Sequence, residues 1–300
     1  MSVVVRNSGG GVDLELELER TDLLPGRLAP AVLRLVARQG REIRGAYATL
    51  IGVEHWQVRQ TDRDANGTTR TRTVTRREDL PRVPIRLLGP TALSAGVRTV
   101  LPFEVPVPSL GPPSVDATVC GVAWELEVKV DVPGFDPGLG VPLTVHQPTG
   151  ALRAGVVGVE QFALWESADA ETDGYRGTIE LDPVPLPVGR SFNGVVTIEA
   201  PGAVDLQEIR AELRVAAKAT VPSGLDEEIT LWAARIAEPG PLAAGTTRLA
   251  FTADLPARPL PTARLPHGRT DATFRVILAR AFARDDHLVR DVALSTTTEL

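Results

Sequence analysis

Two segments of this sequence repeat one pattern. Residues 93–107 read LSAGVRTVLPFEVPV, and residues 242–257 read LAAGTTRLAFTADLPA. Each begins with Leu, a variable residue, Ala and Gly, and then alternates apolar and polar residues at a period of two, as a half-buried β-strand does. Self-similarity over such a distance indicates two copies of one structural unit. The sequence therefore predicts a tandem of two similar β-domains.

The similarity extends to both sides of these segments. Upstream, Gly26-Arg27 matches Gly189-Arg190. Downstream, three alternate residues of one strand match three residues at an offset of 150: Trp124, Leu126 and Val128 correspond to Phe274, Val276 and Leu278. The stretch 147–150 separates the two copies. We expect an N-terminal domain of residues 1–148 and a C-terminal domain of residues 149–300.

The composition favours strands joined by tight turns. The 300 residues include 25 prolines and 27 glycines, which punctuate short strands. The strongest helical candidate is residues 205–219, but its apolar residues alternate and fit a strand at least as well: Ile209, Ala211, Leu213 and Val215. Seven or eight short strands in each half predict an all-β protein of two Greek-key β-sandwich domains.

The expected cellular compartment is the cytoplasm. Cys120 is the only cysteine, so no intramolecular disulfide can form, and its apolar strand predicts a buried structural thiol. The N-terminus lacks a secretory pattern, and no run is long enough to cross a bilayer, so we expect no integral membrane association. Gly9–Gly11 lacks the Lys-Ser/Thr of a phosphate loop and is interpreted as part of a flexible N-terminal lead.

Charge is distributed unevenly between the halves. Residues 1–150 carry 17 basic and 17 acidic side chains, whereas residues 151–300 carry 15 and 21, which accounts for the net charge of −6. A protein that binds nucleic acid through its net charge is expected to be basic. We therefore expect no nucleic-acid partner.

Several structural motifs of the first half resemble the opening of an arrestin-type domain. They are Leu24-Pro25-Gly26 followed by Val32–Val36, then Glu42-Ile43-Arg44-Gly45, Leu93-Ser94-Ala95-Gly96, Pro112-Pro113-Ser114 and the strand Val122–Val132. The sequence is most similar to the bacterial sporulation-control branch of the arrestin-like superfamily. The second half is similar more weakly, mainly at Gly189–Ile198, Leu242–Leu255 and Thr273–Phe282.

The resemblance implies a fold of two arrestin-like sandwiches and a non-enzymatic role. Arrestin relatives are adaptors that hold protein partners on sheet faces, on edge strands or between domains, and the sporulation-control branch is associated with cytoplasmic regulation. One departure concerns the first strand, where receptor arrestins sense phosphate with a lysine pair. Here that strand carries Glu15, Glu17 and Glu19, so phosphoreceptor sensing does not transfer.

The most distinctive charged segment is residues 68–77, TTRTRTVTRR. In a strand, Arg70, Arg72 and Val74 lie on one side and the threonines on the other, and guanidinium groups in a row can bind carboxylates or phosphates in a bidentate manner. Two interpretations remain open: a solvated edge hairpin whose arginines prevent unwanted strand pairing, and a partner-binding edge. The candidate partner-binding residues are Arg59, Arg63, Arg70, Arg72, Arg76 and Arg77.

An acidic segment follows the boundary between the halves. It contains Glu160, Glu166, Asp169, Glu171 and Asp173. Its charge is complementary to that of the arginine-rich segment, and we hypothesise that the two associate and hold the domains in one orientation.

No motif for catalysis, cofactor binding or metal binding is present in the sequence. The histidines are dispersed: His55, His146, His267 and His287. The paired carboxylates Asp13/Glu15, Glu125/Glu127 and Asp285-Asp286 are best explained as solvated faces, because few aromatic residues accompany them. We expect an adaptor or regulatory scaffold that binds unidentified proteins. The alternatives are a structural subunit or spacer, favoured by homo-oligomerisation, and an unrecognised hydrolase.

Overall fold

The computed structural model describes residues 2–63, 66, 68–155, 160–172, 175–280 and 284–297. The protein is all-β, with 68% of its residues in strands. The described part of the chain contains one short helix, α1 (Thr149–Arg153), and one 3₁₀ turn (Gln161–Leu164). The predicted all-β class is confirmed.

The strands form two compact units. The first comprises residues Met1–His55, Arg77–Ser114 and Val122–His146, and the second comprises Trp56–Arg76, Val115–Gly121 and Gln147–Leu300. Two segments of the N-terminal half thus belong to the second unit. The domain boundary expected between residues 148 and 149 stays a prediction.

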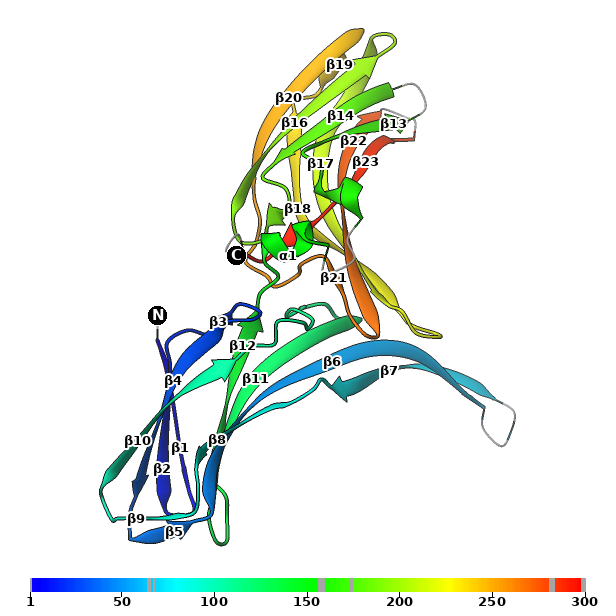
Figure 1. Ribbon diagram of the computed structural model, residues 1–300. Helices are drawn as coiled ribbons and strands as arrows, with labels where there is room; N and C mark the ends of the chain where they lie inside the picture. Colours follow the sequence, from blue (N-terminus) through cyan, green and yellow to red (C-terminus); the bar gives the residue numbers. More distant parts are fainter. Residues whose placement is uncertain are drawn as a thin grey trace. The chain divides into compact units, whose positions relative to one another are not determined.

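The smaller sheet of the first unit has four strands in the order β1-β2-β4-β10 (Figure 1). Its strands are β1 (Val3–Gly9), β2 (Val12–Leu18), β4 (Leu28–Ala37) and β10 (Arg98–Pro106). All neighbours are antiparallel. The N-terminal lead expected to be flexible is therefore a strand: residues 3–9 pair with β2 across a turn in which Gly10 and Gly11 adopt positive φ.

A larger sheet of six strands accompanies it, in the order β3-β12-β11-β6-β7, with β8 also paired to β6. Its strands are β3 (Asp22–Leu23), β6 (Gly45–Arg63), β7 (Thr69–Asp79), β8 (Val83–Leu88), β11 (Cys120–Asp131) and β12 (Gly138–Val145). β5 (Arg41–Ile43) and β9 (Thr91–Leu93) form a separate small pair.

The second unit has a four-stranded sheet in the order β13-β14-β16-β20 and a six-stranded sheet. The six-stranded sheet has the order β18-β17-β22-β21, with β19 also paired to β17 and β23 also paired to β22. The first is formed by β13 (Ser167–Thr172), β14 (Tyr175–Asp182), β16 (Ser191–Ala200) and β20 (Gly245–Asp254). The second is formed by β17 (Val204–Ala219), β18 (Asp226–Ala237), β19 (Gly240–Leu242), β21 (Ala263–Arg264), β22 (Gly268–Arg280) and β23 (Asp286–Val292). β15 (Leu186–Pro187) pairs with β24 (Leu294–Ser295). Residues 204–219 are a strand, as their alternation favoured.

The two units repeat one strand order. In each, a four-stranded antiparallel sheet accompanies a long central strand, β6 or β17, that pairs with two successive strands, β7 and β8 or β18 and β19. Each also contains one short parallel pair, β3 with β12 and β15 with β24. The internal repeat seen in the sequence is therefore a repeat of topology.

Matched turns occupy equivalent places in the two units. Gly26 and Gly189 have φ of 72° and 79°, a left-handed conformation that glycine adopts without steric cost. Arg27 N–H donates to Leu24 O over 3.2 Å, and Arg190 N–H donates to Pro187 O over the same distance. The glycines that the sequence aligned thus make the same turn.

Each sheet buries one face. β2 alternates fully buried with half-buried residues over its whole length. In the second unit, four aromatic rings from both sheets meet in the core: Phe192, Trp232, Phe251 and Phe274. Phe251 stacks on Phe274 with centroids 5.6 Å apart. Burial of each such side chain contributes about 1.5–3 kcal/mol, so this cluster joins the two layers.

Candidate functional site

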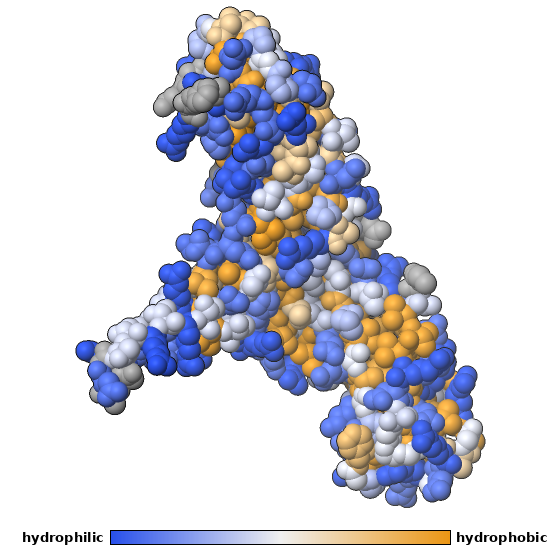
Figure 2. Space-filling model, turned by 180° about the vertical axis from the view of Figure 1, so that it is seen from behind, coloured by the Kyte–Doolittle hydropathy of each residue, from blue (hydrophilic) through white to orange (hydrophobic). Residues whose placement is uncertain are grey.

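The arginine-rich segment is part of a two-stranded ribbon formed by the end of β6, residues 56–63, and the start of β7, residues 69–76 (Figure 1). These residues are counted with the second unit. The two strands are connected through Asn66-Gly67, a sequence typical of hairpin turns, of which Gly67 lies outside the described residues. The space-filling view shows only hydrophilic and weakly polar surface toward the end of the ribbon on the visible face (Figure 2).

The base of the ribbon is anchored within the second unit. The indole of Trp56 stacks on His267 with ring centroids 3.9 Å apart and planes 14° from parallel. Gln57 N–H donates to Val119 O over 2.8 Å, and Gln57 O accepts from Leu225 N–H over 3.0 Å. Aromatic stacking and backbone hydrogen bonds therefore hold residues 56 and 57 in place.

Beyond this base the ribbon is exposed on both faces. Ten of the eleven residues of β7 are exposed, and Val74 is half-buried. A pair of strands without a covering layer is marginally stable alone, and its four threonines at alternate positions supply the β-propensity that favours the extended form. This exposure makes the ribbon available to a partner.

The candidate arginines are divided between the two faces of the ribbon. Thr61 and Thr71 share a face, because their hydroxyl oxygens are 3.2 Å apart. Strand alternation puts Arg59 and Arg63 on that face, and Arg70, Arg72 and Arg76 on the opposite face. Arg77 follows on the threonine side and is counted with the first unit. The structure therefore keeps the row of Arg70 and Arg72 but does not add Arg59 and Arg63 to it.

The arginines also differ in their contacts. Arg72 Nε lies 3.3 Å from an Asp62 carboxylate oxygen, and both side chains are more than half exposed. Arg59 N–H donates to Ser223 O over 2.8 Å at the anchored base. Among the described residues, Arg70 and Arg76 have no carboxylate within 4.0 Å, so their guanidinium groups are free to bind an acidic partner.

The acidic segment forms the edge strand β13 and the residues before it. Glu171 pairs with Arg176 on the neighbouring strand over 3.1 Å, and Asp169 accepts a hydrogen bond from Thr178 over 3.1 Å. Asp173 lies outside the described residues. The side-chain contacts of Asp169 and Glu171 thus lie within their own sheet, and the association of this segment with the ribbon arginines stays a hypothesis.

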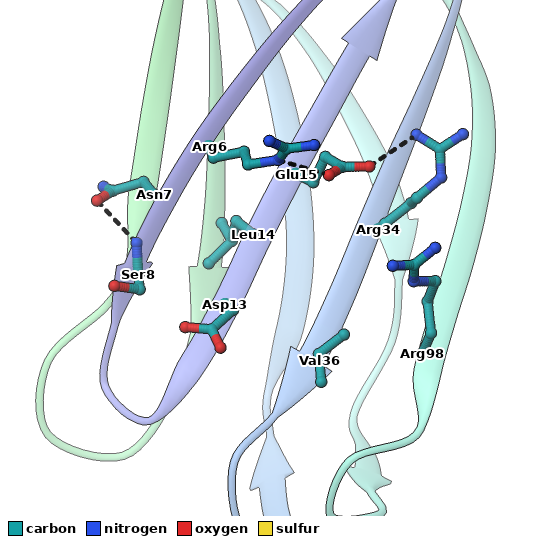
Figure 3. A pocket seen from close by; sticks show the side chains of 9 residues that line it. All are labelled: Arg6, Asn7, Ser8, Asp13, Leu14, Glu15, Arg34, Val36 and Arg98. Atoms are coloured by element: carbon teal, nitrogen blue, oxygen red, sulfur yellow. Dashed lines mark hydrogen bonds and ion pairs between the residues drawn. The ribbon is translucent and has the colours of Figure 1, made fainter.

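A hollow of about 570 Å³ lies on the outer face of the first unit's four-stranded sheet (Figure 3). Arg6 Nε binds Glu15 at 2.7 Å, and Arg34 binds the same carboxylate at 3.3 Å. The hydrogen bond from Arg6 is the largest cause that holds the pKa of Glu15 below its usual value. The sequence predicted Glu15 to be part of a solvated face and did not indicate this cluster, because the cluster forms only when β1 and β4 pair on either side of β2.

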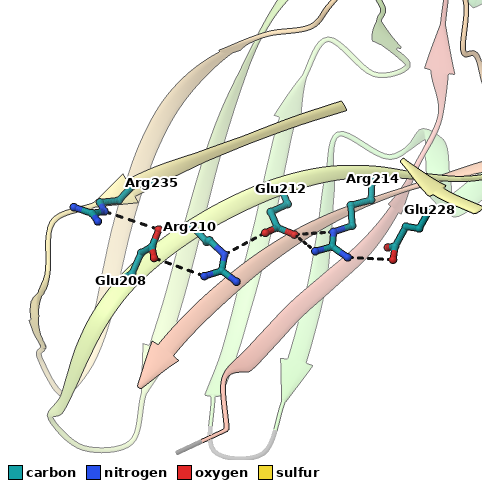
Figure 4. A network of polar contacts seen from close by, with 6 residues as sticks. All are labelled: Glu208, Arg210, Glu212, Arg214, Glu228 and Arg235. Carbon is teal, nitrogen blue, oxygen red and sulfur yellow. Dashed lines mark hydrogen bonds and ion pairs between the residues drawn. The ribbon is translucent and has the colours of Figure 1, made fainter. Parts of the chain in front are cut away.

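A second charged ladder crosses the outer face of the second unit's six-stranded sheet (Figure 4). Glu212, whose side chain is only 9% exposed, binds Arg210 at 3.1 Å and Arg214 at 2.6 Å. Arg214 also binds Glu228 at 3.1 Å. The three carboxylates of this ladder, Glu208, Glu212 and Glu228, each have a cationic neighbour, which is the arrangement of a structural ion-pair network.

Two of the paired carboxylates named from the sequence bind arginines in the described structure. Asp286 pairs with Arg280, and Asp13 pairs with Arg38 at 2.7 Å. Within the ranges that the structure describes, no three His, Cys, Asp or Glu side chains are grouped in a way that could hold a metal ion. Among the residues that the structure describes, no helix is long and apolar enough to span a bilayer.

The fold and this surface define a class: an all-β protein of two layered units that carries an exposed basic ribbon. Comparison with models of known protein families and with curated proteins finds no match for the chain.

Proposed function

We propose that this protein is an arrestin-like adaptor or regulatory scaffold of the bacterial sporulation-control type, and that it acts in the cytoplasm without catalysing a reaction. The repeat of one strand order in two units supports the arrestin-like interpretation, since arrestin relatives contain two such sandwiches. The sequence motifs at Leu24-Pro25-Gly26 and Leu93–Gly96 support the same interpretation, because they lie at turns between strands.

The observation that carries the proposed binding role is the arginine ribbon. Arg70, Arg72 and Arg76 lie on one face of a strand that ends its sheet, and the backbone edge beyond that strand is unpaired in the described structure. Strand addition supplies affinity through main-chain hydrogen bonds, and charged side chains supply specificity. The partner proposed from this geometry is a protein with an acidic, extended segment.

The test is affinity capture of the full tagged chain from its host, compared with the ribbon variant Arg70→Glu/Arg72→Glu/Arg76→Glu. A matched control, Arg20→Glu/Arg86→Glu/Arg190→Glu, changes the net charge equally at exposed arginines outside the ribbon. We expect one protein to copurify with the wild type and the control and to be lost with the ribbon variant. Retention by the ribbon variant would place the binding surface elsewhere.

The second candidate function is that of a structural subunit or spacer. It is favoured by the presence of a basic edge strand, β7, and an acidic edge strand, β13, in one chain. Recovery of the wild-type chain with itself alone in the capture experiment would favour this candidate over the adaptor. An enzymatic role requires a pocket with converging catalytic groups, and a hydrolase is the least supported of the three candidates.

A further inference from the structure

We propose that the ribbon of one molecule docks on β13 of a second copy of the same chain, as an added strand with matched charges. The inference does not depend on the adaptor function, since self-association can occur whether or not the ribbon also captures another protein. The inference assigns β13 as the surface to which the ribbon binds.

β13 is suited to receive a strand. It ends its sheet and pairs with β14 on one side only. Asp169 and Glu171 are exposed and alternate with Ala168 and Ala170, which face the core side. The Glu171–Arg176 pair is 69% and 76% exposed, and pairs at such exposure contribute little to stability. The two carboxylates can therefore exchange their present contacts for a partner's guanidinium groups at small cost.

The ribbon has the complementary pattern. Arg70 and Arg72 have the same two-residue spacing on β7, so each pair of side chains spans about 7 Å along its strand. When two strands pair, residues opposite each other bring their Cβ atoms to about 4.5–5.5 Å, and opposite charges there attract. Asp169 and Glu171 can thus each face one arginine while the backbone edges exchange hydrogen bonds.

Other edge strands fit this role less well. β10 carries Pro102 and Pro106, which lack the N–H that an added strand requires. β18 is acidic at its start, but Glu228 already binds Arg214 and Arg275, and Glu227 accepts backbone N–H groups from residues 118 and 119. The contacts of Asp169 and Glu171 on β13, by contrast, are exposed.

A second copy is the occupant that the charges favour. The chain has six arginines and two aspartates within residues 59–77, and five carboxylates with no basic residue within residues 160–173. Because β7 and β13 are different surfaces, their contact is heterologous. It closes into a dimer or ring if the rotation permits and otherwise extends as a chain.

The test is sedimentation velocity of the full chain at concentrations up to about 100 µM, at about 0.05 M and about 0.5 M salt, where screening differs strongly. We expect the wild type to associate at low salt. The ribbon reversal Arg70→Glu/Arg72→Glu and the β13 reversal Asp169→Arg/Glu171→Arg should each weaken association about tenfold or more, because attractive pairs become repulsive. The control Arg20→Glu/Arg190→Glu should associate as the wild type does.

The decisive variant combines both reversals in one chain. Its ribbon is acidic and its β13 is basic, so the matched pairs return with opposite sign, and association should be restored. A wild type that stays monomeric at low salt would overturn the proposal, as would association that either reversal leaves unchanged. The proposal would also be overturned if each single reversal abolished association and the combined variant did not restore it. The charges would then not be paired across the contact.

Discussion

Arg290 carries a buried charge that is hydrogen-bonded to backbone carbonyls rather than paired with a carboxylate. The residue is 4% exposed. Its guanidinium donates to Ile179 O over 2.7 Å and to Glu166 O over 3.3 Å, and also to Trp165 O. Burial lowers the pKa of the guanidinium below its usual value. The usual pKa of arginine is so high that the group nevertheless stays charged. One side chain therefore satisfies three carbonyls from two segments.

The variant Arg290→Met should lower the free energy of unfolding by about 2 kcal/mol or more, because buried carbonyls lose their donors. Chemical denaturation monitored by circular dichroism measures this change. Arg248→Met is the matched control, since Arg248 is 67% exposed and its contact with Glu180 is 3.7 Å long; a change within about 0.5 kcal/mol is expected there. Equal effects of the two substitutions would contradict the role given to Arg290.

The strand β2 depends on its neighbours for its acidic face. Asp13 and Glu15 alternate with buried apolar residues. Arg6 on β1 and Arg34 on β4 bind Glu15, and Arg38, directly after β4, binds Asp13. The hydrogen bond from Arg38 is the largest cause that lowers the pKa of Asp13, as that from Arg6 does for Glu15. The carboxylates of β2 would repel one another, and the arginines on either side of the strand offset this repulsion.

These lowered pKa values predict an acid-sensitive contribution to stability. In the unfolded chain both carboxylates take up protons near pH 4, whereas in the folded chain they do so only at lower pH. Their stabilisation is therefore fully present above that range and is lost as the pH falls through the folded-state values. The unfolding free energy of the wild type should fall below about pH 4.5 more steeply than that of Asp13→Asn/Glu15→Gln. Identical slopes in acid denaturation titrations would contradict this prediction.

At the scale of the whole molecule, the second compact unit includes residues from both halves of the sequence. Residues 56–76 and 115–121 are counted with the second unit. Trp56 stacks on His267, and the Glu227 carboxylate accepts N–H groups from residues 118 and 119. A cut between residues 148 and 149 would remove these contacts from the second unit.

The fragment 149–300 should consequently exchange amide hydrogens faster than the full chain at residues 222–228 and 265–270, which lose these neighbours. Strands β14 and β16 serve as the internal reference, since their pairing lies entirely within the fragment. Hydrogen exchange followed by mass spectrometry measures both regions together. Equal protection throughout would show that residues 149–300 form a complete folding unit.

Local patterns were sufficient to predict the all-β class, the repeat and most strands. Alternation at a period of two is a property of neighbouring residues, so β2, β10 and β20 were readable from the sequence. β1 was missed because Val3–Gly9 is followed by glycines and its partner strand, not its own pattern, makes it a strand. The row of Arg70 and Arg72 was also predicted from alternation at a period of two, which puts both side chains on one face of the strand.

Only the tertiary structure decided which charges meet. The partners of Glu15 lie on the two strands beside β2, Arg6 on β1 and Arg34 on β4. That strand order is set by long-range packing rather than by local sequence. The closest partners of Glu212, by contrast, lie two residues away on its own strand. Tertiary structure also decided the division of the six arginines between two faces of the ribbon, which depends on the register of β6 against β7. Alternation is local and therefore legible in the sequence, whereas register and strand order arise from contacts between residues far apart in the chain.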